Sequence, residues 1–213
     1  MTCDFSLAHY RELLGAAQAG GYRCAGFDRV PEGGDLILRH DVDLSLAAAI
    51  AVAEVEADAG AWSTWFLMTR STFYNLASPE GEGAIERLRA LGHGIAHHAV
   101  YPHVELDERF DPVVAWHNPD PEFMQAPIEG AVNVMEPPFF DPAHYRSDSN
   151  QRWRHGCPHA ELASGAFEWL QLLIHPEIWA FDGATMRESM ESMLDADRAA
   201  RLEGLRSDRI DLS

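Results

Sequence analysis

The chain has 213 residues, of which 46% are hydrophobic, so it can form one domain with a substantial core and is not globally disordered. Its formal net charge is -18, and such a surface repels phosphate backbones, so nucleic acid is not an expected partner. No run of about 18 apolar residues is present, which predicts no membrane span. The N-terminal residues lack a basic start followed by an apolar core, so we expect no secretory signal and a cytoplasmic protein.

Cysteine and histidine are distributed very differently. Cys3, Cys24 and Cys157 are far apart and form no C-x-x-C pair, so neither a disulfide framework nor a thiolate zinc site is expected. In contrast, eight of the 11 histidines lie between His93 and His159. Histidine is the commonest metal ligand, and this density directs attention to a metal site.

The first half of the chain alternates between helix-like and strand-like segments. Apolar residues at helical spacing predict a helix over 6–19, which the pair Gly20-Gly21 ends. Strand, helix, strand, helix and strand then follow in turn, at 36–38, 45–60, 62–68, 80–91 and 94–100. This order is the signature of βαβ units and a parallel sheet, within a single domain over residues 1–213.

The second half gives weaker signals. Residues 113–120 resemble a strand that runs into a turn, and 121–160 are rich in Pro, Asn and Asp, which predicts long loops. Residues 169–176 predict a buried strand, and 185–205 predict a closing helix with an apolar side.

Polar residues recur directly after these apolar strand runs. The residues in such positions are Asp41, Asp43, His98, His117 and His175. The carboxyl ends of parallel strands converge on one face of a barrel, where active sites sit, so we expect these side chains to meet.

Asp41 and Asp43 point to the same side of an extended chain because they are two residues apart. Two close carboxylates resist joint ionisation unless a cation lies beside them, which favours a divalent metal. The alternative is that this Asp-x-Asp turn only caps the helix that begins near Ser45.

The histidines that follow the third strand fit the same interpretation. His98 and His103, together with an Asp, would supply three protein ligands and leave one position open, as in catalytic zinc sites. Cobalt, nickel and manganese accept similar ligands. His175 ends an apolar strand before Pro176, which favours an acid–base role over that of a neutral core histidine.

Four motifs in order resemble the polysaccharide deacetylase superfamily (carbohydrate esterase family four), and in particular a cytosolic branch. The first motif stands as Arg39-His40-Asp41-Val42-Asp43, and the second as residues 92–98, ending at His98. A later motif resembles residues 147–154, and the last runs from Leu172 to His175. The resemblance extends from about residue 5 to about residue 180.

The resemblance implies an α/β fold, a distorted and incomplete (β/α) barrel, and a metal-dependent deacetylase that acts on an amino sugar. It implies that Asp41 is the general base, that Asp43 and His98 bind the metal, and that His175 is the general acid. We expect His103 to be the third ligand, with His117 as the alternative. The residues implied to contact substrate or to support the acid are His117, Asn118, Asp148, Arg152 and Trp153.

The chain also departs from the family pattern. Gly94 replaces a glutamate, the arginine-containing third motif is absent, and the segment between His103 and Trp116 is too short for a helix. We therefore expect a barrel that lacks one helix and is either more open or completed by a partner subunit in a homo-oligomer. Two other functions fit the sequence: an amidohydrolase acting on a non-sugar amide, and a non-catalytic ligand-binding member of the same fold.

Overall fold

Eight parallel strands form one sheet in a computed structural model that describes residues 3–211. The order across the sheet is β6-β5-β4-β3-β2-β8-β7, with β1 also pairing with β2. The strands are β1 (Arg23–Ala25), β2 (Asp35–Val42), β3 (Thr64–Met68), β4 (Gly94–Ala99), β5 (Val113–Trp116), β6 (Val132–Asn133), β7 (Tyr145–Ser147) and β8 (Trp169–Ile174).

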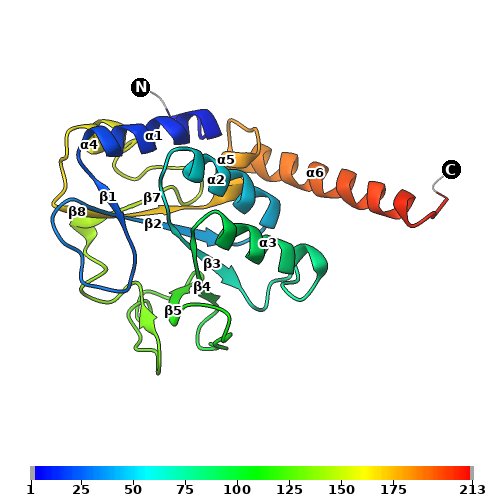
Figure 1. Cartoon of the computed structure of the whole chain (residues 1–213), viewed down its shortest axis with the longest axis horizontal. Helices are drawn as coiled ribbons and strands as arrows, with labels where there is room; N and C mark the ends of the chain where they lie inside the picture. The colour runs from blue at the N-terminus through cyan, green and yellow to red at the C-terminus, as the bar shows by residue number, and fades with distance from the viewer. Residues whose placement is uncertain (1–2, 212–213) are drawn as a thin grey trace.

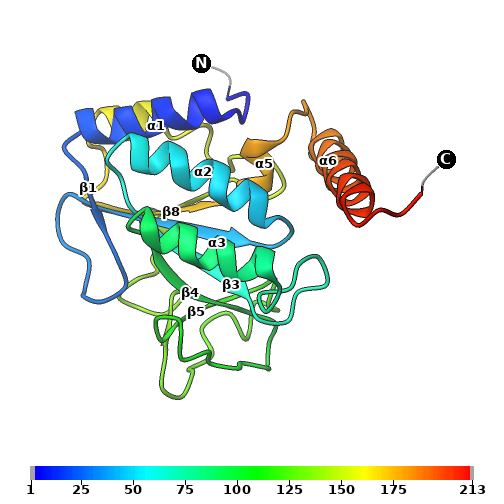
Figure 2. The ribbon, with the colours of Figure 1, turned by 45° about the vertical axis from the view of Figure 1, so that its right-hand side comes forward.

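Helices cover one face of this sheet, and long loops lie against the other (Figures 1 and 2). The helices are α1 (Leu7–Ala19), α2 (Leu46–Asp58), α3 (Pro79–Ala90), α4 (His159–Ala163), α5 (Pro176–Ala180) and α6 (Met186–Ser207), with a 3-10 turn η1 (Pro142–His144). The side chains of Ser6, Ser45 and Ser78 accept hydrogen bonds at the N-termini of α1, α2 and α3. Such caps stabilise a helix by about 1 kcal/mol, which explains why these helices begin where they do.

Strand β2 is buried on both faces and divides its side chains between them. Leu36, Leu38 and Val42 face the core beneath the helices, and Ile37 joins a second core cluster on the other face. Since side chains alternate along a strand, Asp41 shares the face of Ile37, while His40 shares the helix-covered face. The sheet therefore directs Asp41, and Asp43 beyond it, toward the side where the loops lie.

The sheet is not closed, because its order ends at β6 on one side and at β7 on the other. This agrees with the expected α/β fold and incomplete barrel. More than one helix is missing: within the described residues, the connections β4–β5, β5–β6 and β6–β7 contain no α-helix. The loop-rich composition of residues 121–160 accounts for two of these connections, and the shortness of 100–112 accounts for the third.

Helix α6 ends the chain and projects from the body of the molecule (Figures 1 and 2). Its only buried residues are Ser189 and Met193, so the apolar side predicted from the sequence packs over just the first turns. Among the described residues, no helix combines the length and the hydropathy needed to cross a membrane.

Candidate metal centre

Three side chains, from β4 and from the segments that follow β2 and β5, converge at the carboxyl end of the sheet. The Oδ1 atom of Asp43 lies 2.9 Å from Nε2 of His98 and 3.0 Å from Nδ1 of His117. The two ring nitrogens are 3.2 Å apart. Asp43 follows β2, His98 is in β4 and His117 follows β5. The parallel register aligns these strands, which is why distant residues meet here.

The donor atoms fit a divalent cation. A tetrahedral zinc ion with ligands at about 2.0–2.1 Å holds them about 3.3 Å apart, close to the separations observed. Oδ1 of Asp43 is buried and has no hydrogen-bond partner, although both rings lie within ion-pair distance. Such an oxygen is costly unless a cation or a donor satisfies it. The Asp43, His98 and His117 set thus meets the requirements for three metal ligands.

A backbone carbonyl orients His98. Its Nδ1 atom lies 2.9 Å from the carbonyl oxygen of Ala115, which fixes the ring so that Nε2 faces Asp43. Metal-ligating histidines usually donate their second ring N–H in this way. The side chain of His98 is 1% exposed, while that of His117 is 29% exposed, so the triangle is reached from solvent on the His117 side.

Electrostatics in this cluster favour a charged carboxylate. Burial alone would raise the pKa of Asp43, but its contacts with His117 and His98 hold that pKa well below the usual range. The same contact with Asp43 raises the pKa of His117. Metal binding requires a neutral imidazole, so protons compete with the cation for His117 at acidic pH.

Asp41 lies beside the triangle and is held by Arg39. Both oxygens of Asp41 accept hydrogen bonds from that guanidinium, at 2.8 Å from Nε and 2.7 Å from Nη2. Oδ2 of Asp41 is 3.8 Å from Nε2 of His98. Burial would raise the pKa of Asp41, but Arg39 and His98 lower it, so the carboxylate is charged at neutral pH.

His175 forms a second polar unit with Asp148. Its Nδ1 atom is 2.6 Å from Oδ1 of Asp148, and its backbone N–H donates to the same carboxylate. Trp179 also donates to this carboxylate, at 2.6 Å. Burial would lower the pKa of His175, but the adjacent Asp148 raises it to about 10, so the imidazole is protonated at neutral pH.

The strand register brings the two units together. His40 of β2 is opposite Ile174, the last residue of β8, so Asp41 lies beside the point where His175 leaves the sheet to begin α5. Adjacent strands of a sheet are about 4.8 Å apart. The cluster therefore combines a cation-binding triangle, a charged carboxylate and a protonated histidine.

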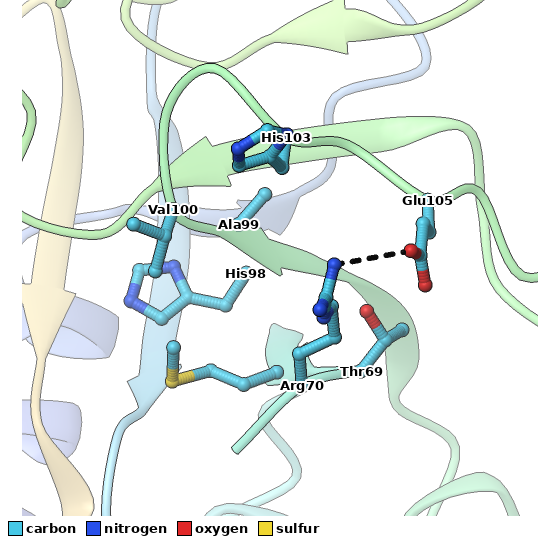
Figure 3. A pocket seen from close by; sticks show the side chains of 8 residues that line it. Thr69, Arg70, His98, Ala99, Val100, His103 and Glu105 are labelled. Carbon is cyan, nitrogen blue, oxygen red and sulfur yellow. Dashed lines mark hydrogen bonds and ion pairs between the residues drawn. The ribbon is translucent and has the colours of Figure 1, made fainter. Parts of the chain in front are cut away.

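A cavity of about 430 Å³ adjoins this cluster, and His98 forms part of its wall (Figure 3). Arg70 and Glu105 contribute polar groups to the same cavity and are 3.4 Å apart. His103, the ligand first expected from the sequence, is exposed in the loop after β4 and lines the cavity. It is His117, the alternative, that contacts both Asp43 and His98, because β5 carries it across to them.

The other residues expected to contact substrate occupy different positions. Asn118 is exposed, and its side-chain nitrogen lies 3.3 Å from Nε2 of His117. Asp148 supports His175, as expected, whereas Arg152 is exposed and makes no described side-chain contact with that pair. Trp153 is 8% exposed and stacks on Phe5 in an aromatic cluster, so it belongs to the core rather than to a pocket wall.

Two buried residues near the cluster were not identified from the sequence. The pairing of Arg39 with Asp41 follows from their i, i+2 spacing on one strand and could have been inferred. Glu177 lies in the single-turn α5, is 1% exposed, and has an Oε2 atom without a hydrogen-bond partner. No sequence signal pointed to Glu177, because a helix this short has no periodicity.

Comparisons of the chain with protein-family models, curated protein sequences and solved structures returned no match.

Proposed function

We propose that this chain is a divalent-metal-dependent hydrolase that removes an N-acyl group, acetyl in the first instance, from an amino sugar. The observation that carries the proposal is the triangle of Asp43, His98 and His117, partly open to solvent and flanked by Asp41 and His175. Zinc is the preferred ion for one carboxylate and two imidazoles, and cobalt, nickel or manganese would suit the same ligands.

A bound ion would supply Lewis acidity toward an amide carbonyl and toward a water molecule. Asp41 is positioned to accept the proton of the attacking water, and Arg39 keeps its carboxylate charged and oriented. His175, protonated through Asp148, can donate its proton to the leaving amine. Asp41 in β2 and His175 directly after β8 come from paired strands, which supports a shared role at one reacting amide.

The neighbouring cavity supports a polar substrate. Its volume of about 430 Å³ is within the range of small-molecule sites. Arg70 and Glu105 offer charged donors and acceptors there, which suit a hydroxyl-rich ring better than an apolar amide. The resemblance of the motifs to polysaccharide deacetylases favours an acetylated amino sugar.

The test is acetate release from N-acetylated amino sugars, measured with zinc-loaded protein beside a simple non-sugar acetamide. We expect turnover on the sugar amides, loss of turnover and of the zinc bound at the Asp43 centre in Asp43→Ala, and retention of that zinc in His175→Ala. In the latter variant turnover should fall by about 10²–10⁴-fold, the usual contribution of a general acid. The exposed His155→Ala is the matched histidine control.

Undiminished turnover in His175→Ala would reject the acid role. Turnover on the simple acetamide alone would replace the sugar substrate with a non-sugar amide. Full turnover in zinc-free protein would contradict the proposed function itself.

A further inference from the structure

A second group of metal-ligand side chains lies on the helix-covered side of the molecule. Cys3 precedes α1, His9 is in the first turn of α1, and Cys157 directly precedes Pro158 and α4. One ligand atom from each residue lies within 4.8 Å of the other two. Helices α1 and α4 pack side by side, and this contact brings the two distant cysteines together (Figure 1).

The orientation of His9 is that of a metal ligand. Its Nδ1 atom lies 3.0 Å from Oε2 of Glu12, and its Nε2 atom lies 3.2 Å from Sγ of Cys157. When Nδ1–H donates to a carboxylate, Nε2 carries a free lone pair, here directed at the thiols. A carboxylate behind a ligating histidine is the usual arrangement in zinc sites.

One indole N–H and several aromatic rings surround the thiols. Trp153 Nε1 donates to Sγ of Cys3 at 3.4 Å. Phe5 stacks on Trp153, and Trp179 stacks on His9 with ring planes 6° apart. Both cysteines are half-buried and His9 is 5% exposed, so the cluster is partly shielded from water.

We propose that Cys3, His9 and Cys157 form a second zinc-binding site. Two thiolates and one imidazole are a ligand set that zinc prefers, and tetrahedral zinc holds such atoms about 3.3–3.8 Å apart. The fourth position is left for water. The site joins the N-terminal segment to the loop between β7 and α4, across a sequence separation of 154 residues (157 − 3).

This site is connected to His175, the proposed catalytic acid, through Trp179. Trp179 packs against His9 on one side and donates its Nε1–H to Asp148, the partner of His175. Asp148 and Cys157 belong to the same connection between β7 and α4. Because the unfolded chain does not hold these three ligands together, zinc binds the folded state and its binding free energy adds to stability.

The same geometry also resembles a nucleophilic cysteine with a histidine base. Two observations favour the metal instead. A second thiol, Cys3, reaches the same point, which a nucleophile does not need. The three cavities described for residues 3–211 are lined by other residues than Cys3, His9 and Cys157, which gives a substrate-binding role of this cysteine no support.

The test is cobalt substitution of the reduced, full-length protein. Thiolate-to-cobalt charge transfer gives a near-ultraviolet absorption that an Asp-His-His site cannot produce. We expect this absorption in wild type and in Asp43→Ala, and its loss in Cys3→Ser and Cys157→Ser. Cys24→Ser, which removes a thiol outside the cluster, is the matched control and should retain it.

Zinc analysis gives the second readout and separates this site from the Asp43 centre. The zinc content of Cys157→Ser should be one equivalent lower than in wild type, and circular dichroism should show that the variant is folded. A wild type without the thiolate absorption would overturn the proposal, as would an absorption that survives in Cys157→Ser. So would a Cys3–Cys157 disulfide in protein that takes up no metal at this site after reduction.

Discussion

Nδ1 of His175 lies 2.6 Å from Oδ1 of Asp148, and this contact sets the charge of the histidine. Asp148 is fully buried and receives two further hydrogen bonds, from the backbone of His175 and from Trp179. The carboxylate is thus fixed on three sides and raises the pKa of His175 to about 10 against the opposing effect of burial. Because the charge of His175 depends on Asp148, changes at Asp148 should alter both the stability of the protein and the ability of His175 to donate a proton.

The first prediction is a loss of stability at alkaline pH. The pKa of His175 is raised from 6.5 to about 10 in the folded protein. The contribution of this pair is therefore complete below pH 6.5 and lost as the pH rises toward 10. Asp148→Asn should be less stable than wild type at pH 6.5 and should lose less stability over this window. Urea unfolding of the metal-free proteins across this pH range measures the free energy of unfolding of each variant. The exposed Asp195→Asn is the control.

Arg39 and Asp41 provide the second prediction. Both side chains are buried, 3% and 5% exposed, and form a two-point ion pair. Arg39→Met leaves the Asp41 charge uncompensated and should destabilise the protein by about 3–5 kcal/mol. The double variant Arg39→Met with Asp41→Asn should regain part of that loss, because no charge is then stranded. Guanidinium unfolding of the three proteins is the measurement, and a double variant no more stable than Arg39→Met would contradict this account.

His40 stands between these two residues in the sequence but faces the other way. Its Nε2 atom is 2.7 Å from Oε1 of Glu56, and its ring stacks on Trp65 at 4.0 Å between centroids. We predict that His40→Ala is destabilised by about 2–5 kcal/mol, since it removes a hydrogen bond to buried Glu56 and leaves a cavity beside Trp65. Zinc content at the Asp43 centre should be unchanged in the folded fraction, because His40 lies on the helix-covered face. Loss of zinc from folded His40→Ala would show that this division between faces is wrong.

The positions of Asp41, Asp43, His98 and His175 could be predicted because each follows an apolar run of residues. The rule that parallel strands end together then places these residues at one edge. The choice between His103 and His117 could not be made in this way. It depends on the path of the chain between β4 and β5, where no periodic pattern constrains it. The contact of His117 with Asp43 is a product of the register of β5 against β4.

The cysteines illustrate the same limit. Cys3 and Cys157 are far apart in the sequence, so their spacing predicted no shared site. Only the packing of α1 against α4 brings them to His9. The number of missing helices was also underestimated, because residues 121–160 signal loops without showing that these loops connect strands of the sheet.

Glu177 gives a prediction with a different pH window. Burial raises its pKa from 4.5 to about 8. An acid that is harder to ionise in the folded state lowers stability as the pH rises from 4.5 through 8. Glu177→Gln keeps the shape without this ionisation, so it should be more stable than wild type at pH 8.5 and closer to it at pH 5. Thermal unfolding at the two pH values checks this, and an equal difference at both would contradict the assignment.

The central claim is that Asp43, His98 and His117 bind a divalent cation. The most direct measurement is the zinc content of Cys157→Ser protein after incubation with zinc and removal of excess metal. This variant lacks one thiolate ligand of the second site, so the zinc that remains reports on the Asp43 centre. This account predicts about one equivalent, lost on adding His117→Ala and retained on adding His103→Ala. A zinc-free Cys157→Ser protein, or zinc lost with His103→Ala and kept with His117→Ala, would contradict it.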